Sequence, residues 1–162
     1  MLNKKKIELP VFEDIQMGMS TGLALMGYVP ISCYPRFDFL LLAMNQLVNH
    51  LDKIRIMSDQ QFKPKVIIRT SVGSKKPLNG GPQHTQDYTE QFKKILTEVK
   101  VVYLKSPKQI FPEFKKGIIV FLNVGLLLAE QIFSIVELCL FIEKMIASLN
   151  WEFLIISNGG IL

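Results

Sequence analysis

The chain has 162 residues, 49% of them hydrophobic, which is enough for one sizeable core and excludes a disordered chain. Its two cysteines, Cys33 and Cys139, lie far apart, which excludes a disulfide framework or metal cluster and favours a reducing compartment. The net charge of +5 arises before residue 117, where 18 of the 19 lysines and arginines lie. These cations form no dense basic helix, so we interpret them as a solvated surface and predict no nucleic-acid partner.

The start of the chain does not have the pattern of a signal peptide. The first six residues carry three lysines, but Glu8, Pro10 and Glu13 follow in place of an apolar run. We therefore expect a cytoplasmic protein.

Helix and strand patterns alternate along the chain. The predicted helices are residues 12–28, 39–57, 85–96, 107–116 and 126–149. The predicted strands are residues 30–34, 65–69, 100–104, 117–123 and 153–157. This alternation predicts an α/β fold with three α/β/α layers and a mostly parallel sheet. Ligands of such sheets bind at the carboxyl ends of the strands, so we expect a site at the loop of residues 70–84.

The first two helices are indicated by their apolar spacing. The first carries an apolar stripe of Ile15, Met19, Leu23 and Met26, and the second carries Leu40, Met44, Leu47, Leu51 and Ile54 on one face. Gly18 and Gly22 weaken the first helix, which suggests that it packs closely against a neighbour or a ligand.

Three segments in the first two-thirds of the chain together resemble one family. The first is Pro10-Val11-Phe12-Glu13 followed by Gly18, Gly22, Ala24, Gly27 and Pro30; the second is Phe37-Asp38-Phe39 followed by Ala43, Gln46, Asn49, Lys53 and Met57-Ser58; the third is Gln83-His84-Thr85-Gln86 after a glycine-rich loop. Their order and spacing resemble the pyrimidine-binding domain in beta subunits of thiamine-diphosphate-dependent 2-oxoacid dehydrogenases of the pyruvate and branched-chain type. The resemblance covers roughly residues 9–115 and implies a transketolase-like domain.

The resemblance implies a role for three residues. Glu13 matches the glutamate that binds the aminopyrimidine of thiamine diphosphate and activates it; the alternative is an acid favoured by the dipole of a helix N-terminus. Phe39 matches the aromatic residue that packs on the pyrimidine, and the alternative is a core residue. His84 matches a histidine that handles protons near the substrate, and the alternative is a surface loop residue. Cys33 and Tyr34 depart from the family, which usually has Glu-Phe there.

The resemblance also implies a division of labour between chains. Residues 1–116 are expected to form the pyrimidine-binding domain without its usual first strand, and the residues that hold Mg²⁺ and the diphosphate are absent, so we predict no metal site. An alpha-type subunit would supply that site, and the beta-type chains would associate with each other in a heterotetramer. The chain is therefore not expected to be active alone. A non-catalytic binding or assembly module is the alternative, and the identity of the 2-oxoacid stays open.

Residues 117–162 lie beyond the resemblance and form an apolar tail of uncertain origin. Their longest uncharged apolar stretch has 13 residues, whereas a membrane span needs about 20. A narrow polar stripe runs along the predicted helix through Glu130, Ser134, Glu137, Lys144 and Ser148. This pattern favours a helix packed on the same domain or against another subunit over a membrane-associated helix or a non-native tail.

Overall fold

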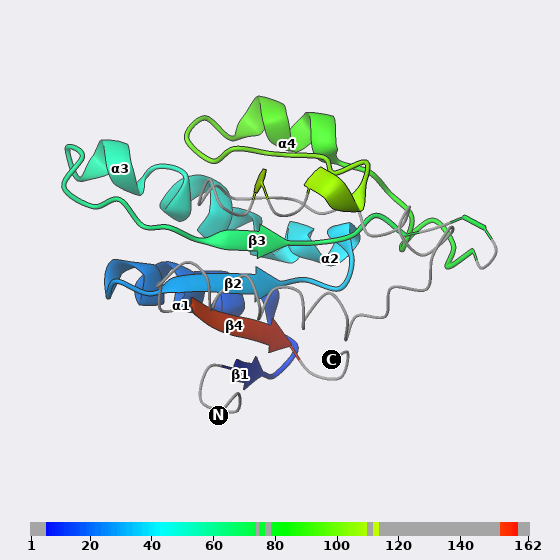
Figure 1. Ribbon diagram of the computed structural model, residues 1–162, viewed down its shortest axis with the longest axis horizontal. Helices are drawn as coiled ribbons and strands as arrows, with labels where there is room; N and C mark the ends of the chain where they lie inside the picture. The colour runs from blue at the N-terminus through cyan, green and yellow to red at the C-terminus, as the bar shows by residue number, and fades with distance from the viewer. Residues whose placement is uncertain (1–5, 74, 77–78, 110–111, 114–152, 159–162) are drawn as a thin grey trace.

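Four parallel strands form the sheet at the centre of the computed structural model (Figure 1), which describes residues 6–73, 75–76, 79–109, 112–113 and 153–158. The strands are β1 (Lys6–Leu9), β2 (Val29–Cys33), β3 (Ile67–Arg69) and β4 (Phe153–Asn158), in the order β1-β4-β2-β3. The register pairs Ile7 with Ile156, and Ile31 with both Ile155 and Ile67. The predicted α/β fold with a parallel sheet is therefore confirmed, and β1 is a strand that the sequence analysis did not predict.

Both faces of the sheet are buried at β2 and β3, whereas the edge strand β1 is partly exposed. Ile31 and its register partner Ile67 lie on one face and are 1% and 0% exposed. Ser32 and its partner Ile68 lie on the opposite face and are also fully buried. Burial on both faces is typical of a parallel sheet whose strands are β-branched and apolar.

Helix α1 (Glu13–Leu25) packs on β2 and β4 and lies behind β2 in Figure 1. Its apolar stripe is not its buried face, because Ile15 and Met26 are 51% and 77% exposed. The buried residues are mainly polar or small: Glu13, Gln16, Met17, Ser20, Thr21 and Ala24. Ser20 and Thr21 donate their hydroxyl groups to helix carbonyl oxygens one turn earlier, at 2.7 and 3.0 Å. Polar groups satisfied in this way can face the sheet without a large desolvation cost.

The two glycines of α1 do not mark close packing within the described part of the chain. A Cβ atom at Gly18 would meet only the Gln46 side chain, at an ordinary contact distance of 3.6 Å, and one at Gly22 would meet nothing within 4 Å. The close neighbour that the sequence suggested is therefore not found here.

We expect Gly22→Ala to raise the free energy of unfolding by about 0.5–1 kcal/mol, because alanine restricts the unfolded chain and fills open space at this exposed helical position. Gly27→Ala is the matched control: the φ of Gly27 is +94°, so alanine should cost about 1 kcal/mol there. Urea unfolding followed by circular dichroism measures both changes. A destabilised Gly22→Ala variant would show that this glycine does meet a close neighbour.

The predicted helix of residues 39–57 is a chain of helical pieces of different pitch. They are α2 (Phe37–Leu40), the 3₁₀ turn η2 (Leu41–Ala43), the π-helix η3 (Asn45–Leu51) and α3 (Ile54–Met57). The predicted inner face is largely confirmed, since Leu40, Leu47 and Leu51 are at most 4% exposed. At the end of η3 the Asp52 N–H donates to the Leu47 carbonyl oxygen at 2.9 Å, five residues back.

The segment after residue 84 differs from the prediction in two places. Helix α4 (Thr89–Ile95) begins four residues later than predicted, and the Asp87 carboxylate accepts a hydrogen bond from the Thr89 N–H at 2.9 Å just before its first turn. The predicted strand of residues 100–104 is wrong, because this segment is not assigned as a strand and pairs with none of the described strands. A 3₁₀ turn, η4 (Pro107–Gln109), follows.

The predicted strand of residues 117–123 and the predicted helix of residues 126–149 lie outside the described residues, and the domain boundary at residue 116 stays a prediction. The predicted final strand is confirmed as β4. In the described ranges we find no helix that is both long and apolar enough to cross a membrane.

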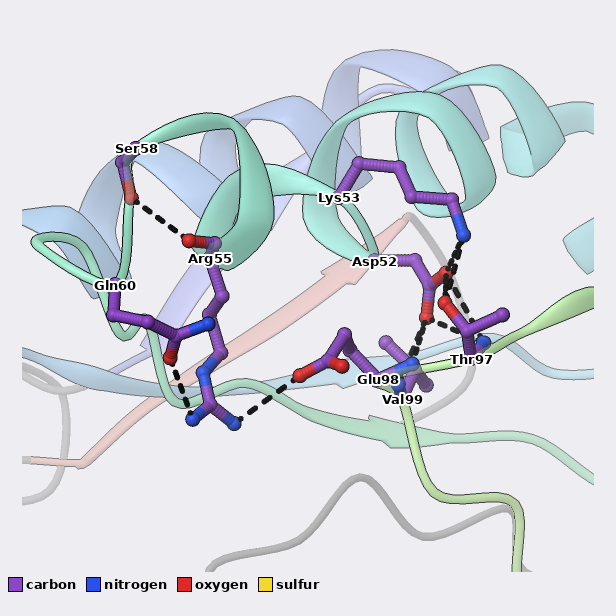
Figure 2. A network of polar contacts seen from close by, with 8 residues as sticks. All are labelled: Asp52, Lys53, Arg55, Ser58, Gln60, Thr97, Glu98 and Val99. Carbon is purple, nitrogen blue, oxygen red and sulfur yellow. Dashed lines mark hydrogen bonds and ion pairs between the residues drawn. The ribbon is translucent and has the colours of Figure 1, made fainter.

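Asp52 connects the helical segment to the turn that follows α4 (Figure 2). Its carboxylate is fully buried and accepts hydrogen bonds from the N–H groups of Thr97, Glu98 and Val99, at 2.8–3.1 Å. The Lys53 ammonium group donates to it at 2.7 Å. Burial raises the pKa of this carboxyl group, but Lys53 and the three N–H groups lower the pKa more, to about 2. Asp52 is therefore a charged anchor between segments 45 residues apart.

Candidate functional site

Glu13 begins α1, four residues after Leu9, where β1 ends. Its side chain is 5% exposed, although the preceding Val11 and Phe12 are more than half exposed. No side chain caps this helix, and Glu13 and Asp14 place two acids in its first turn, where the helix dipole favours negative charge. The chain thus holds a buried carboxyl group at the carboxyl edge of a parallel sheet, where such folds bind ligands.

Tyr34 ties the start of α1 to the end of β2. Its phenol donates a hydrogen bond to the backbone carbonyl oxygen of Glu13 at 3.4 Å, and the residue is fully buried. Burial is the main cause that raises the pKa of this phenol; a hydrogen bond from Ser32 opposes the rise, and the negative charge of Glu13 adds to it. The hydroxyl group therefore stays protonated and remains a donor beside Glu13.

Gln16 lies one turn after Glu13 and ties α1 to two strands. Its side-chain N–H group donates to the Ser32 Oγ at 2.9 Å, the Cys33 carbonyl oxygen at 3.0 Å and the Ile156 carbonyl oxygen at 3.4 Å. Its Oε1 is buried and has no hydrogen-bond partner among the described residues. Gln16 was not predicted from the sequence; the available signal was its position three residues after Glu13, on the same helix face.

Phe39 and His84 come from different segments and meet edge to face. Phe39 lies in α2, directly after β2, and His84 lies in the loop between β3 and α4. Their ring centroids are 5.5 Å apart with an interplanar angle of 79°, and both side chains are partly exposed. Neither residue is a fully buried core residue, and both leave part of the ring exposed where the two rings meet.

The backbone around His84 is held by short-range contacts. The His84 N–H and the Thr85 hydroxyl group both donate to the Gly81 carbonyl oxygen, at 3.1 and 3.0 Å. Gly73 lies so close that a Cβ atom there would overlap the His84 carbonyl oxygen. Only glycine fits at residue 73, which explains part of the glycine content of this loop.

The predicted site residues are therefore positioned by three adjoining elements. Phe39 and His84 are in contact, whereas Glu13 lies on α1, which packs against η2, the turn that follows Phe39. Cys33 faces its register partner Arg69, and burial raises the pKa of the Cys33 thiol more than the Arg69 charge lowers it. The described ranges contain no group of three or more histidine, cysteine or acidic residues that could hold a metal ion.

Comparison with known proteins gives similarity to beta subunits of pyruvate dehydrogenase. Pyruvate dehydrogenase E1 component subunit beta of Gracilaria tenuistipitata var. liui is 33% identical over 101 residues, which cover 62% of this chain and 30% of that protein. The chloroplastic subunit beta-3 of Oryza sativa subsp. japonica is 34% identical over 89 residues, or 55% of this chain and 22% of its own length. The subunit beta of Rickettsia conorii is 30% identical over 92 residues, or 57% and 28%. No family model matches the chain.

The resemblance read from the sequence motifs is confirmed by these relatives. The chain spans under a third of the length of each of them. The rice relative is chloroplastic by name, and the expected cytoplasmic location of this chain stays a prediction. The roles of Glu13, Phe39 and His84 also stay predictions.

Proposed function

We propose that this chain acts as a beta-type subunit, or part of one, of a thiamine-diphosphate-dependent 2-oxoacid dehydrogenase, and that it binds the aminopyrimidine of the cofactor. The observation that carries the proposal is the buried Glu13 carboxyl group at the carboxyl edge of the sheet. The similarity to pyruvate dehydrogenase beta subunits supports the same reaction class, the oxidative decarboxylation of a 2-oxoacid.

The residues present fit an aminopyrimidine ring. Such a ring needs a carboxyl group for one of its nitrogens and an apolar surface for its face. Glu13 offers a carboxyl group that is almost shielded from water, and Phe39 offers a partly exposed aromatic ring. Gln16 adds a buried oxygen without a partner among the described residues, on the same face of α1 as Glu13. This combination of a carboxyl group, an acceptor oxygen and a ring surface matches the chemistry of the cofactor's base.

Each residue has a distinct task in the proposed reaction. Thiamine diphosphate, when bound, supplies the nucleophilic carbon that attacks the 2-oxoacid. Glu13 holds a ring nitrogen by a hydrogen bond, and its low-dielectric surroundings strengthen that bond. Phe39 packs on the ring and excludes water, and His84, in contact with Phe39, takes up or donates a proton on the substrate side.

The proposal includes partners. An alpha-type subunit supplies Mg²⁺ and the residues that hold the diphosphate, and beta-type chains associate in a heterotetramer. Catalysis then needs both chains. The names of the relatives point to pyruvate as the 2-oxoacid to test first.

The proposal is tested by producing the full chain together with an alpha-type subunit. We expect thiamine-diphosphate-dependent decarboxylation of pyruvate in the mixture and none with either chain alone. Phe39→Leu should raise the cofactor concentration needed for half-maximal activity about tenfold, because it removes ring contact. Phe62→Leu is the matched control, since Phe62 is 54% exposed and outside the site. Absence of cofactor binding in every pairing would overturn the proposal and favour a non-catalytic assembly module.

A further inference from the structure

We infer that Asp38 is a positioning residue that fixes His84 against Phe39 through its hydrogen bond with Gln86. Asp38 and Phe39 are neighbours in α2, and His84 and Gln86 are two residues apart in the loop. Asp38 contacts Gln86 and Phe39 contacts His84, so both contacts join α2 to the same loop. The consequence for catalysis rests on the proposed function, whereas the positioning itself does not.

The contacts of this loop define what Asp38 holds. Gln86 Nε2 donates to Asp38 Oδ1 at 2.9 Å across 48 residues of sequence, next to the ring contact between Phe39 and His84. At the start of the loop, the Ser71 carbonyl oxygen accepts from the Phe37 N–H at 2.9 Å. Helix α2 therefore makes hydrogen bonds with the loop close to both of its ends.

Short-range contacts hold the backbone of His84, which lies two residues before Gln86. The His84 N–H donates to the Gly81 carbonyl oxygen, Thr85 donates to the same oxygen, and the Gly73 backbone abuts the His84 carbonyl group. A loop closed this tightly shifts as a unit when one attachment is lost. Release of Gln86 should therefore displace the imidazole from the Phe39 ring.

The Asp38 carboxylate destabilises the folded state at this position, so stability alone does not explain its presence. Its Oδ2 is buried and accepts no hydrogen bond from any described residue, and an unsatisfied buried oxygen is destabilising. Gln86 is exposed, so the hydrogen bond it makes adds little to stability. A costly polar group of this kind is typical of a functional position.

The test, in the full chain, exchanges the hydrogen-bond donor at Gln86 and the acceptor at Asp38. Gln86→Glu places two carboxylates together, and we expect it to weaken the NOE between the Phe39 ring and His84 imidazole protons by at least half. In the complex with the alpha-type subunit, kcat should fall about tenfold with KM unchanged. Adding Asp38→Asn restores a donor and an acceptor, and should bring both readouts back to within about twofold of wild type. Glu90→Gln, at the exposed Glu90–Lys93 pair, is the control and should change neither.

Two results would overturn the inference: an unchanged NOE in Gln86→Glu, or a folded double variant in which the NOE is not restored. Circular dichroism verifies folding in each case. An NOE that responds as expected in a protein that is inactive in every pairing would refute the proposed function and leave the positioning role of Asp38 standing.

Discussion

Glu13→Gln is expected to lower kcat at least a hundredfold in the complex with an alpha-type subunit. The substitution keeps the volume of the side chain and one oxygen acceptor, so the buried surroundings of residue 13 need not repack. It removes the negative charge and the proton-accepting capacity. A positioned acid–base group contributes about 10²–10⁴ in rate, which corresponds to about 3–5 kcal/mol of transition-state stabilisation.

Asp14→Asn is the matched control for this change. Asp14 is the next residue of the same first helical turn, and its carboxylate accepts from Gln46 at 3.5 Å. Both substitutions remove one negative charge from the helix N-terminus, so they affect the helix dipole alike. We therefore expect Asp14→Asn to change kcat less than threefold. Equal kcat values in the two variants would show that Glu13 is only an N-terminal acid of α1.

Asp52→Ala is expected to lower the free energy of unfolding by about 3–5 kcal/mol, because the N–H groups of residues 97–99 lose the carboxylate that they share. Such a loss is a large fraction of the total stability of a domain. Urea unfolding gives the magnitude, and hydrogen exchange at these amides should accelerate before the rest of the chain unfolds.

Asp52→Asn is the milder substitution, and its free energy of unfolding can still be measured if Asp52→Ala prevents folding. It retains one acceptor oxygen and loses the charge, so about 2 kcal/mol is expected. Glu98→Gln is its matched acid-to-amide control, because the ion pair of Glu98 with Arg55, at 3.4 Å, is partly exposed (Figure 2). Surface pairs contribute less than about 1 kcal/mol. Equal losses in the two variants would contradict the anchoring role of Asp52.

The same carboxylate predicts a pH dependence. The pKa of Asp52 falls from 3.8 to about 2 in the folded chain, so the folded state binds this proton less readily than the unfolded state. The stabilisation is fully present above pH 5 and is lost as the pH falls towards 2. It amounts to about 2 kcal/mol. In Asp52→Asn this part of the acid destabilisation should disappear.

The sequence by itself determined the parallel α/β fold and the family resemblance. Short β-branched runs such as those of β3 and β4 are local signals, and the motifs around Glu13, Phe39 and His84 carry residue types at fixed spacing. A helix over residues 39–57 was also visible, because its apolar face keeps an approximately helical period, but its division into four helical pieces was not predicted. Local periodicity is sufficient for features of this kind.

Only the tertiary structure decided which groups these elements bury and connect. The apolar stripe of α1 is exposed and its polar side faces the sheet, because Gln16 finds partners on β2 and β4, far away in the sequence. The same holds for Asp52 with residues 97–99 and for Asp38 with Gln86. Periodicity records the average polarity of a helix face, whereas a buried polar group is stable only where distant donors and acceptors meet it.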